Sequence, residues 1–202
     1  IIDNTGVDPS TWNNHGSILR IKDQWYVFYH GSSGSRKYNR RARVERIEVD
    51  EKNGLIRQAQ MTSSGFADAL DPRERLDAAY GCQVTGGAYF TEENGSFPMV
   101  HITSGCSVSY RYFDYGREAG DWRITLALRP LQEGRAVVLV GGEEKAEIFF
   151  APAGTENEAA LTLAEGVLTG LSGKAELEIR FASEREGELA SLYWIEQRSA
   201  ER

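Results

Sequence analysis

The sequence predicts an all-β protein, and three observations lead to that fold class. Helical periodicity is almost absent, whereas short stretches that alternate apolar and polar residues recur along the whole 202-residue chain. Twenty-one glycines against five prolines indicate many tight turns between those stretches. The strands divide into a short first group and a longer second group, so the sequence predicts two units.

The first unit, residues 1–66, is expected to be a small antiparallel sheet. Four strands are predicted, at Ser17–Lys22, Gln24–His30, Arg41–Asp50 and Leu55–Met61. The turn before the last strand contains Asn53-Gly54, a pair that tolerates the positive φ of a tight hairpin turn. A sheet of this size buries too little surface to stabilise a core alone. We therefore expect it to belong to a larger unit.

The second unit is expected to be a sandwich or barrel. Small and polar residues with one proline place a linker at residues 67–75, and residues 76–202 follow as one domain. Nine short strands separated by regularly spaced turns are typical of such a domain. The stretch Glu156–Leu168 is open between a strand, which is favoured slightly, and a short helix.

Charge and composition exclude some partners. The net charge is −7, and nucleic acid and anionic membranes bind basic surfaces, so we expect neither as a partner. No apolar run approaches the roughly 18 residues of a membrane helix. A neutral polymer such as a polysaccharide remains compatible with this charge. The chain begins with Ile1, so the missing leader says nothing about secretion.

The two cysteines, Cys82 and Cys106, match no metal-binding spacing. A free, half-buried thiol is favoured over a disulfide bridge, because cysteine is among the residues most often buried.

Particular strings in the first unit resemble a known family. Trp12–Ser17 reads WNNHGS, Trp25–His30 reads WYVFYH, and Gln60–Gly65 reads QMTSSG. These strings resemble the last blades of family 43 glycoside hydrolases. In the second unit, Ala78–Gly86 and Tyr110–Gly116 are similar to the C-terminal sandwich of arabinofuranosidases and xylosidases of that family, which is related to carbohydrate-binding module family 6.

The resemblance implies a fold and an activity. The fold would be the terminal part of a five-bladed β-propeller followed by a β-sandwich of the jelly-roll type. The parent would be an inverting hydrolase that cleaves arabinofuranosyl or xylosyl bonds of arabinoxylan or related plant polysaccharides. Inversion needs an acid and a base carboxylate far enough apart to admit a water. In the family the catalytic carboxylates lie in earlier blades, so we expect no catalytic residue in this chain and no activity of the chain alone.

The resemblance also implies site residues in the first unit. His15 matches a histidine of the propeller channel that helps to hold a calcium ion; the alternative is a histidine satisfied by backbone in a turn. Calcium prefers several oxygen ligands, so one histidine is a poor site by itself. Arg40 aligns with an arginine that reaches the active-site pocket, although it could instead belong to a basic surface cluster. Asn14 is a second candidate for contact with sugar.

In the sandwich, sugar binding would need exposed aromatic rings with polar neighbours. Tyr89 and Phe90 follow Gly86-Gly87 and are the preferred stacking candidates. Other candidate rings, most of which we expect in the core, are Tyr115, Trp122, Tyr193 and Trp194.

Three functions are open at this point: a part of a hydrolase, a structural brace on the propeller, and a carbohydrate-binding module. The expected partners are plant cell-wall polysaccharide or oligosaccharide and the N-terminal part of the same enzyme. Calcium in the channel is the expected ion, and no organic cofactor is expected. A secreted or periplasmic location is favoured over a cytoplasmic one.

Overall fold

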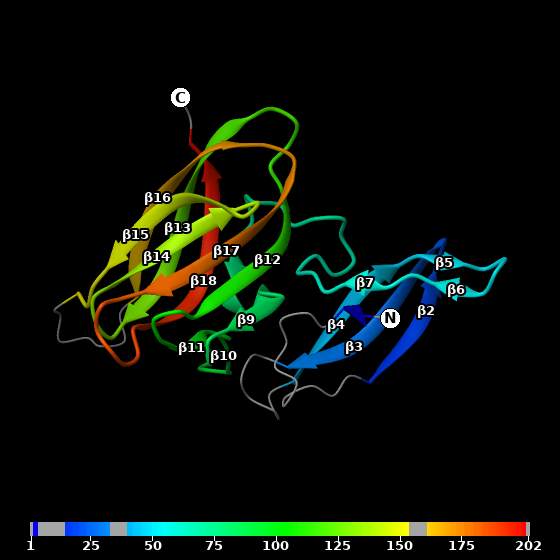
Figure 1. Cartoon of the computed structure of the whole chain (residues 1–202), viewed down its shortest axis with the longest axis horizontal. Coiled ribbons are helices and arrows are strands. Elements are labelled where there is room, and N and C mark those ends of the chain that lie inside the picture. Colours follow the sequence, from blue (N-terminus) through cyan, green and yellow to red (C-terminus); the bar gives the residue numbers. More distant parts are fainter. Residues whose placement is uncertain (1, 4–14, 33–39, 154–160, 201–202) are drawn as a thin grey trace.

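The computed structural model describes residues 2–3, 15–32, 40–153 and 161–200. Within these ranges the regular structure is β-strand, apart from one 3-10 turn, η2 (Ala78–Tyr80). The strands form a small sheet and a larger sandwich that lie side by side (Figure 1). In these same ranges no helix has the length and apolarity to cross a membrane.

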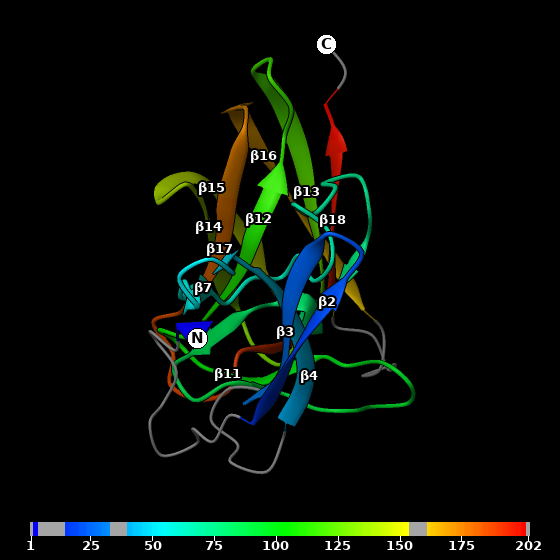
Figure 2. The same ribbon diagram turned by 90° about the vertical axis from the view of Figure 1, so that its right-hand side faces the viewer.

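The small sheet has three antiparallel strands in the order β2-β3-β4. They are β2 (Gly16–Ile21), β3 (Gln24–Ser32) and β4 (Arg40–Ile47). The first two form the predicted hairpin, and β4 lies at the edge of the sheet. When the molecule is turned, this sheet crosses in front of the sandwich (Figure 2).

Short strands complete the first unit. They are β1 (Ile2–Asp3), β5 (Val49–Asp50), β6 (Leu55–Ile56) and β7 (Ala59–Gln60). β5 and β6 form the hairpin predicted from Asn53-Gly54, and Gly54 has the positive φ (66°) that this turn requires. β1 pairs with β7 in parallel.

The sandwich consists of two antiparallel sheets. One has the order β10-β11-β18-β13-β16, with β8 beside β18, and its strands are β8 (Leu76–Asp77), β10 (Tyr89–Phe90), β11 (Met99–Ile102), β13 (Gly120–Pro130), β16 (Thr162–Leu171) and β18 (Ala190–Ser199). The other has the order β15-β14-β17-β12-β9, with β9 (Gln83–Thr85), β12 (Ser107–Asp114), β14 (Gly134–Val140), β15 (Glu143–Phe150) and β17 (Lys174–Ala182).

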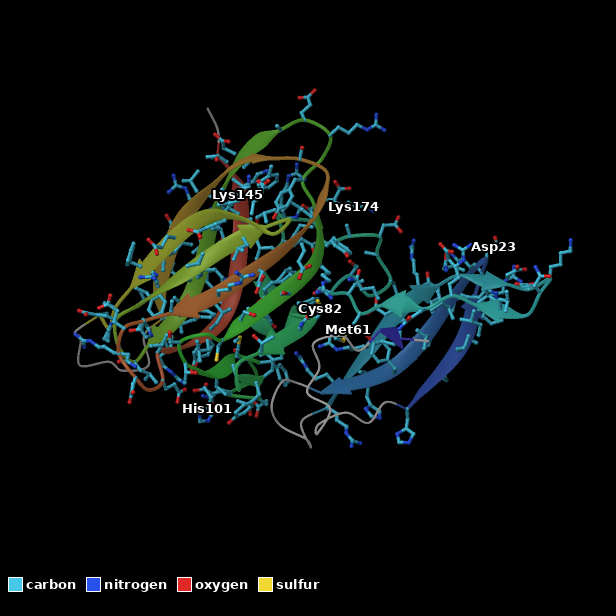
Figure 3. All side chains as sticks on the ribbon, in the orientation of Figure 1. Asp23, Met61, Cys82, His101, Lys145 and Lys174 are labelled. Atoms are coloured by element: carbon cyan, nitrogen blue, oxygen red, sulfur yellow. The ribbon has the colours of Figure 1, made fainter. Side chains whose placement is uncertain are left out.

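The main core lies between these two sheets. Along β13, Ile124, Leu126 and Leu128 are fully buried because every second side chain of a strand points to the same face. A second, smaller cluster joins the two units: Val27, Tyr29 and Ile47 of the small sheet pack with Met61 and Cys82. Figure 3 shows Met61 and Cys82 close together where the units meet.

The expected all-β architecture with a sandwich is confirmed. Of the stretch that was open between helix and strand, residues 162–168 belong to β16, and residues 154–160 lie outside the described ranges. Both cysteines are free and buried. The predicted linker packs on the sandwich, since the Leu70 amide donates to the Tyr112 carbonyl at 2.8 Å. Its limits at residues 67–75 stay a prediction.

Candidate functional site

A cavity of about 500 Å³ opens between the small sheet and the sandwich. Its walls come from β3, β4, residues 62–66 and η2. Strand alternation along β4 places Arg41, Arg43 and Glu45 on one face, whereas Arg40 lies on the other. Arg41 and Arg43 are the two charged residues that line the cavity.

Arg41 is half-buried against the sandwich. Its Nη1 donates to the carbonyl oxygen of Ala79, and its guanidinium carbon lies 5.4 Å from the ring centroids of both Phe90 and Phe97. Contacts of this kind attract a cation to the face of the ring. Burial and the charge of Arg43 lower the pKa of Arg41, while Asp77 and Tyr80 act in the opposite direction.

Arg43 lies on the same face as Arg41 and makes one hydrogen bond to the described residues. Its Nη2 donates to the carbonyl oxygen of Gly81 at 3.2 Å. Its Nε is buried and has no hydrogen-bond partner among the described residues. This nitrogen lies against Gly31 of β3 and is closed off from the cavity, so only the terminal nitrogens of Arg43 can meet a ligand there.

Glu45 holds the wall of the cavity together. Its carboxylate is 3% exposed and accepts hydrogen bonds from the Tyr29 hydroxyl at 3.1 Å, the Thr62 amide at 2.8 Å and the Thr62 hydroxyl at 2.6 Å. Burial raises the pKa of Glu45, and the hydrogen bonds from Thr62 and Tyr29 oppose that rise. The carboxylate therefore fixes residue 62 to β4.

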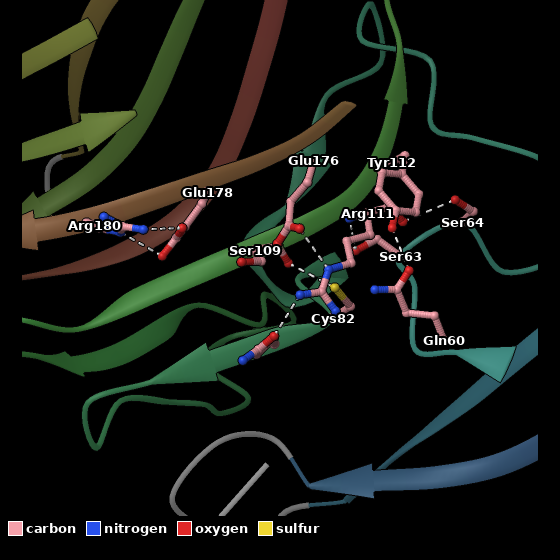
Figure 4. A network of polar contacts seen from close by, with 11 residues as sticks. Gln60, Ser63, Ser64, Cys82, Ser109, Arg111, Tyr112, Glu176, Glu178 and Arg180 are labelled. Carbon is pink, nitrogen blue, oxygen red and sulfur yellow. Dashed lines mark hydrogen bonds and ion pairs between the residues drawn. The ribbon is translucent and has the colours of Figure 1, made fainter. Parts of the chain in front are cut away.

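A second polar network ties the same segment to the sandwich (Figure 4). The Ser63 amide donates to the Arg111 carbonyl at 2.6 Å, and the Ser64 hydroxyl donates to the same oxygen at 3.2 Å. Arg111 forms an ion pair with Glu176 at 3.0 Å and donates to Gln83 at 3.0 Å. Because β12 carries Arg111, the segment beside the cavity is fixed to both units.

His15 meets a second histidine at the start of the small sheet. Its Nδ1 lies 3.3 Å from Nε2 of His30, and its amide donates to the same nitrogen at 3.1 Å. Desolvation, Arg40 and His15 lower the pKa of His30. Across the described part of the chain, no three His, Cys, Asp or Glu side chains gather in a way that could hold a metal. Two imidazoles without oxygen ligands do not fit calcium.

The structure brings two candidates from the resemblance together. Arg40 is exposed at the start of β4. Its positive charge contributes to the lowered pKa of His30, and His30 contacts His15. Arg40 faces away from Arg41 and Arg43, so these arginines do not form one cluster. Asn14 lies outside the described residues.

The stacking candidates of the sandwich need a correction. Phe90 is 1% exposed and belongs to the core, so its ring offers no face to a sugar and we withdraw it. Tyr89 is half-buried and stacks on His101, with ring centroids 5.0 Å apart. The amide of His101 donates to Glu188 at 3.1 Å, and Figure 3 places His101 at one end of the sandwich. Tyr89 remains a candidate.

The remaining aromatic rings divide between core and surface. Tyr115 and Trp122 pack edge to face in the core, as expected for most rings. Tyr193 and Trp194 are half-buried, and each lies beside an arginine. Sequence reasoning missed the exposed rings of the described ranges, which are Phe66, Tyr80, Phe97 and Phe149. No sequence signal separates them from core rings, because their exposure depends on which distant segments cover them.

Known proteins resemble this chain in sequence and in fold. No family model matches the chain. Over 88 residues it is 36% identical to a xylosidase/arabinosidase from Thermoclostridium stercorarium, a match that covers 42% of this chain and 18% of that protein. A crystal structure of a family 43 arabinoxylan arabinofuranohydrolase from Bacillus subtilis matches 94% of this chain with a TM-score of 0.63 and 16% identity. The chain resembles the C-terminal region of a family 43 glycoside hydrolase.

The sandwich alone matches complete modules of another kind. A family 6 carbohydrate-binding module from Clostridium stercorarium, in complex with cellobiose, gives a TM-score of 0.55 at 14% identity and covers 65% of this chain and 98% of the module. A β-1,3-glucan-binding family 6 module from Bacillus halodurans gives 0.53 at 20% identity, with 65% and 99% covered. These likenesses confirm the expected fold class; the count of five blades stays an expectation.

The chain spans only part of the length of two of the proteins that it matches. It covers 18% of the Thermoclostridium relative and 41% of the Bacillus subtilis chain. Most of each of those proteins therefore has no counterpart among the 202 residues.

Proposed function

We propose that this chain is the C-terminal part of a glycoside hydrolase that acts on arabinoxylan or a related plant polysaccharide. The parent would cleave arabinofuranosyl or xylosyl bonds with inversion, and this part would carry none of the catalytic carboxylates. The carrying observation is the Bacillus subtilis structure, because its match extends over both the small sheet and the sandwich, 94% of this chain, yet takes in only 41% of that enzyme. The name of the 36% identical relative supports the same substrate class.

The small sheet supports this proposal physically. It has three main strands, and two apolar side chains of β2, Leu19 and Ile21, are 54% and 38% exposed. Apolar side chains exposed side by side mark a surface that another element covers. We propose the N-terminal part of the same enzyme as that element, with His15 and Arg40 facing its sugar-binding pocket together with Asn14.

Calcium in the channel rests on the resemblance alone. The oxygen ligands that calcium prefers would have to come from outside the described residues, since His15 and His30 offer only nitrogens here. We also propose a secreted or periplasmic location, because a cell-wall polysaccharide is a polymer outside the cytoplasm.

The second candidate function is a carbohydrate-binding module, and the sandwich favours it because it matches 98% and 99% of two complete modules. Tyr89 stacked on His101, with Glu188 beside them, is the candidate contact with sugar.

Affinity electrophoresis of the pure chain tests the polysaccharide partner. Gels that contain arabinoxylan, xylan or arabinan are compared with a gel that contains none. We expect retardation by arabinoxylan or xylan, and less of it for Tyr89→Ala. Equal mobility in all four gels would contradict both candidate functions as sugar-binding ones and would favour a purely structural brace.

A further inference from the structure

We propose that the cavity between the small sheet and the sandwich binds a carboxylate-bearing sugar, a uronic acid unit of an oligosaccharide. This inference rests on the proposed function, because it assumes that the partner is a plant polysaccharide. It adds a second recognition site, which binds an acidic group and lies on the opposite face of β4 from Arg40.

Arg41 and Arg43 carry more hydrogen-bond donors than their contacts with the described residues use. A guanidinium has five N–H groups. Among the described residues, Arg41 donates one hydrogen bond to Ala79 and Arg43 donates one to Gly81, and their other terminal N–H groups have no partner there. Neither arginine forms an ion pair in the part of the chain that the structure describes, although most other arginines there do.

The second argument is the charge around the two arginines. The titratable groups that interact with them are Glu45, Tyr29 and Cys82 beside Arg43, and Asp77 and Tyr80 beside Arg41. The oxygens of Glu45 are engaged with Tyr29 and Thr62. Asp77 is exposed, so solvent and salt screen its charge. Two adjacent guanidiniums therefore keep an excess of positive charge at the cavity, and their planar forks suit the two oxygens of a carboxylate.

The third argument is the wall of the cavity, which suits a sugar ring better than an inorganic anion. Phe66 and Tyr80 line it and are 53% and 52% exposed. Exposed rings stack on the C–H face of a pyranose, whereas phosphate gains nothing from them. Thr62 and Ser63 line the same wall, with their hydroxyl groups bonded to Glu45 and to the Arg111 amide. The volume of about 500 Å³ lies within the usual range of small-molecule sites.

The test is calorimetric titration of the full chain with three probes. They are a xylo-oligosaccharide with one glucuronic acid branch, the same oligosaccharide without the branch, and inorganic phosphate. We expect the branched probe to bind about tenfold or more tightly than the other two. Arg43→Gln should weaken that binding about tenfold to a hundredfold, the usual effect of losing a charge-assisted hydrogen bond. Tyr80→Ala should weaken it as well, and Arg198→Gln, an exposed arginine of β18, should leave it unchanged.

Several outcomes would overturn the inference. They are equal affinity for the branched and unbranched probes, phosphate binding as tight as the branched probe, or binding that neither Arg43→Gln nor Tyr80→Ala alters. If Arg43→Gln does not fold, Tyr80→Ala decides, because this side chain is exposed and its loss leaves the core intact. Retardation by arabinoxylan without preference for the acidic branch would leave the proposed function standing and remove this inference alone.

Discussion

Glu45 shows at the scale of one residue how the small sheet uses a buried carboxylate. Its folded-state pKa is raised by burial above the ordinary value of 4.5. The folded chain therefore binds this proton more tightly than the unfolded chain does. The free energy of unfolding should fall as the pH rises from about 4.5 through the raised pKa of Glu45.

We expect Glu45→Gln to remove that fall, because the amide does not titrate. Urea unfolding between pH 4 and pH 8 measures this effect. The free energy of unfolding should decrease with rising pH more for the wild type than for the variant. Parallel pH profiles for the two proteins would show that Glu45 does not titrate differently in the folded state.

Gly81 is a second position where one residue decides packing. A Cβ there would overlap Val108 and come within 3.1 Å of Phe90 and 3.2 Å of the Ala78 carbonyl. Gly120 is the matched control, since a Cβ there meets only Trp122, at 3.9 Å. Gly81→Ala should cost about 1–3 kcal/mol of stability, the usual cost of overpacking, and Gly120→Ala should stay within about 0.5 kcal/mol.

Thermal or urea unfolding of the two alanine variants provides the measurement. Equal stabilities would mean that the surroundings of Gly81 relax freely, against the close packing found there.

The sequence alone did not determine which face of its strand each side chain occupies. The alternation of Arg41–Asp50 predicted a strand, yet it could not decide which arginine of the run faces which way. One step along a strand moves a side chain to the other face. The same limit applies to Tyr89 and Phe90: neighbours in sequence, one stacks on His101 and the other is buried in the core.

At the scale of elements, local patterns predicted most strands, but the predicted strand Leu55–Met61 was wrong: it is divided into β6 and β7, and neither joins the sheet of β2, β3 and β4. The hairpin of β2 and β3, the Asn53-Gly54 turn and the sandwich strands follow from alternation and turn chemistry, which are local. The cavity could not be predicted, because its walls come from segments far apart in the sequence, such as β4 and η2. The pairing of strands that sets these distances is decided by burial over the whole chain.

Hydrogen exchange should separate the two kinds of element. β13 lies between β16 and β18, and its inward side chains are fully buried. β3 lies between β2 and β4 in a sheet whose cluster holds far fewer buried residues. Local stability follows buried apolar contact, so amides of β3 should exchange at least about tenfold faster than those of β13.

Exchange followed by mass spectrometry of peptic peptides, or by NMR, gives both rates in one sample. Equal protection of β3 and β13 would show that the small sheet is stable as it stands. In that case its exposed Leu19 and Ile21 would no longer argue for a covering N-terminal part.

At the scale of the whole molecule, the two units are joined by shared packing and by polar contacts. Met61 and Cys82 complete the small cluster, and residues 63–64 are bonded to β12. A family 43 structure matches both units together, whereas isolated binding modules match 65% of the chain. The sandwich and the small sheet are therefore held together by these contacts, and the cavity lies between them.

The central claim is that these 202 residues are a non-catalytic part of a hydrolase. Turnover of aryl arabinofuranosides and aryl xylosides by the pure chain tests it most directly, with the chain's mass of 22.5 kDa verified in the same sample. We expect no turnover above buffer, because the resemblance implies that the acid and base carboxylates of the proposed parent lie in earlier blades. Turnover that stays with the 22.5 kDa species through purification would contradict it.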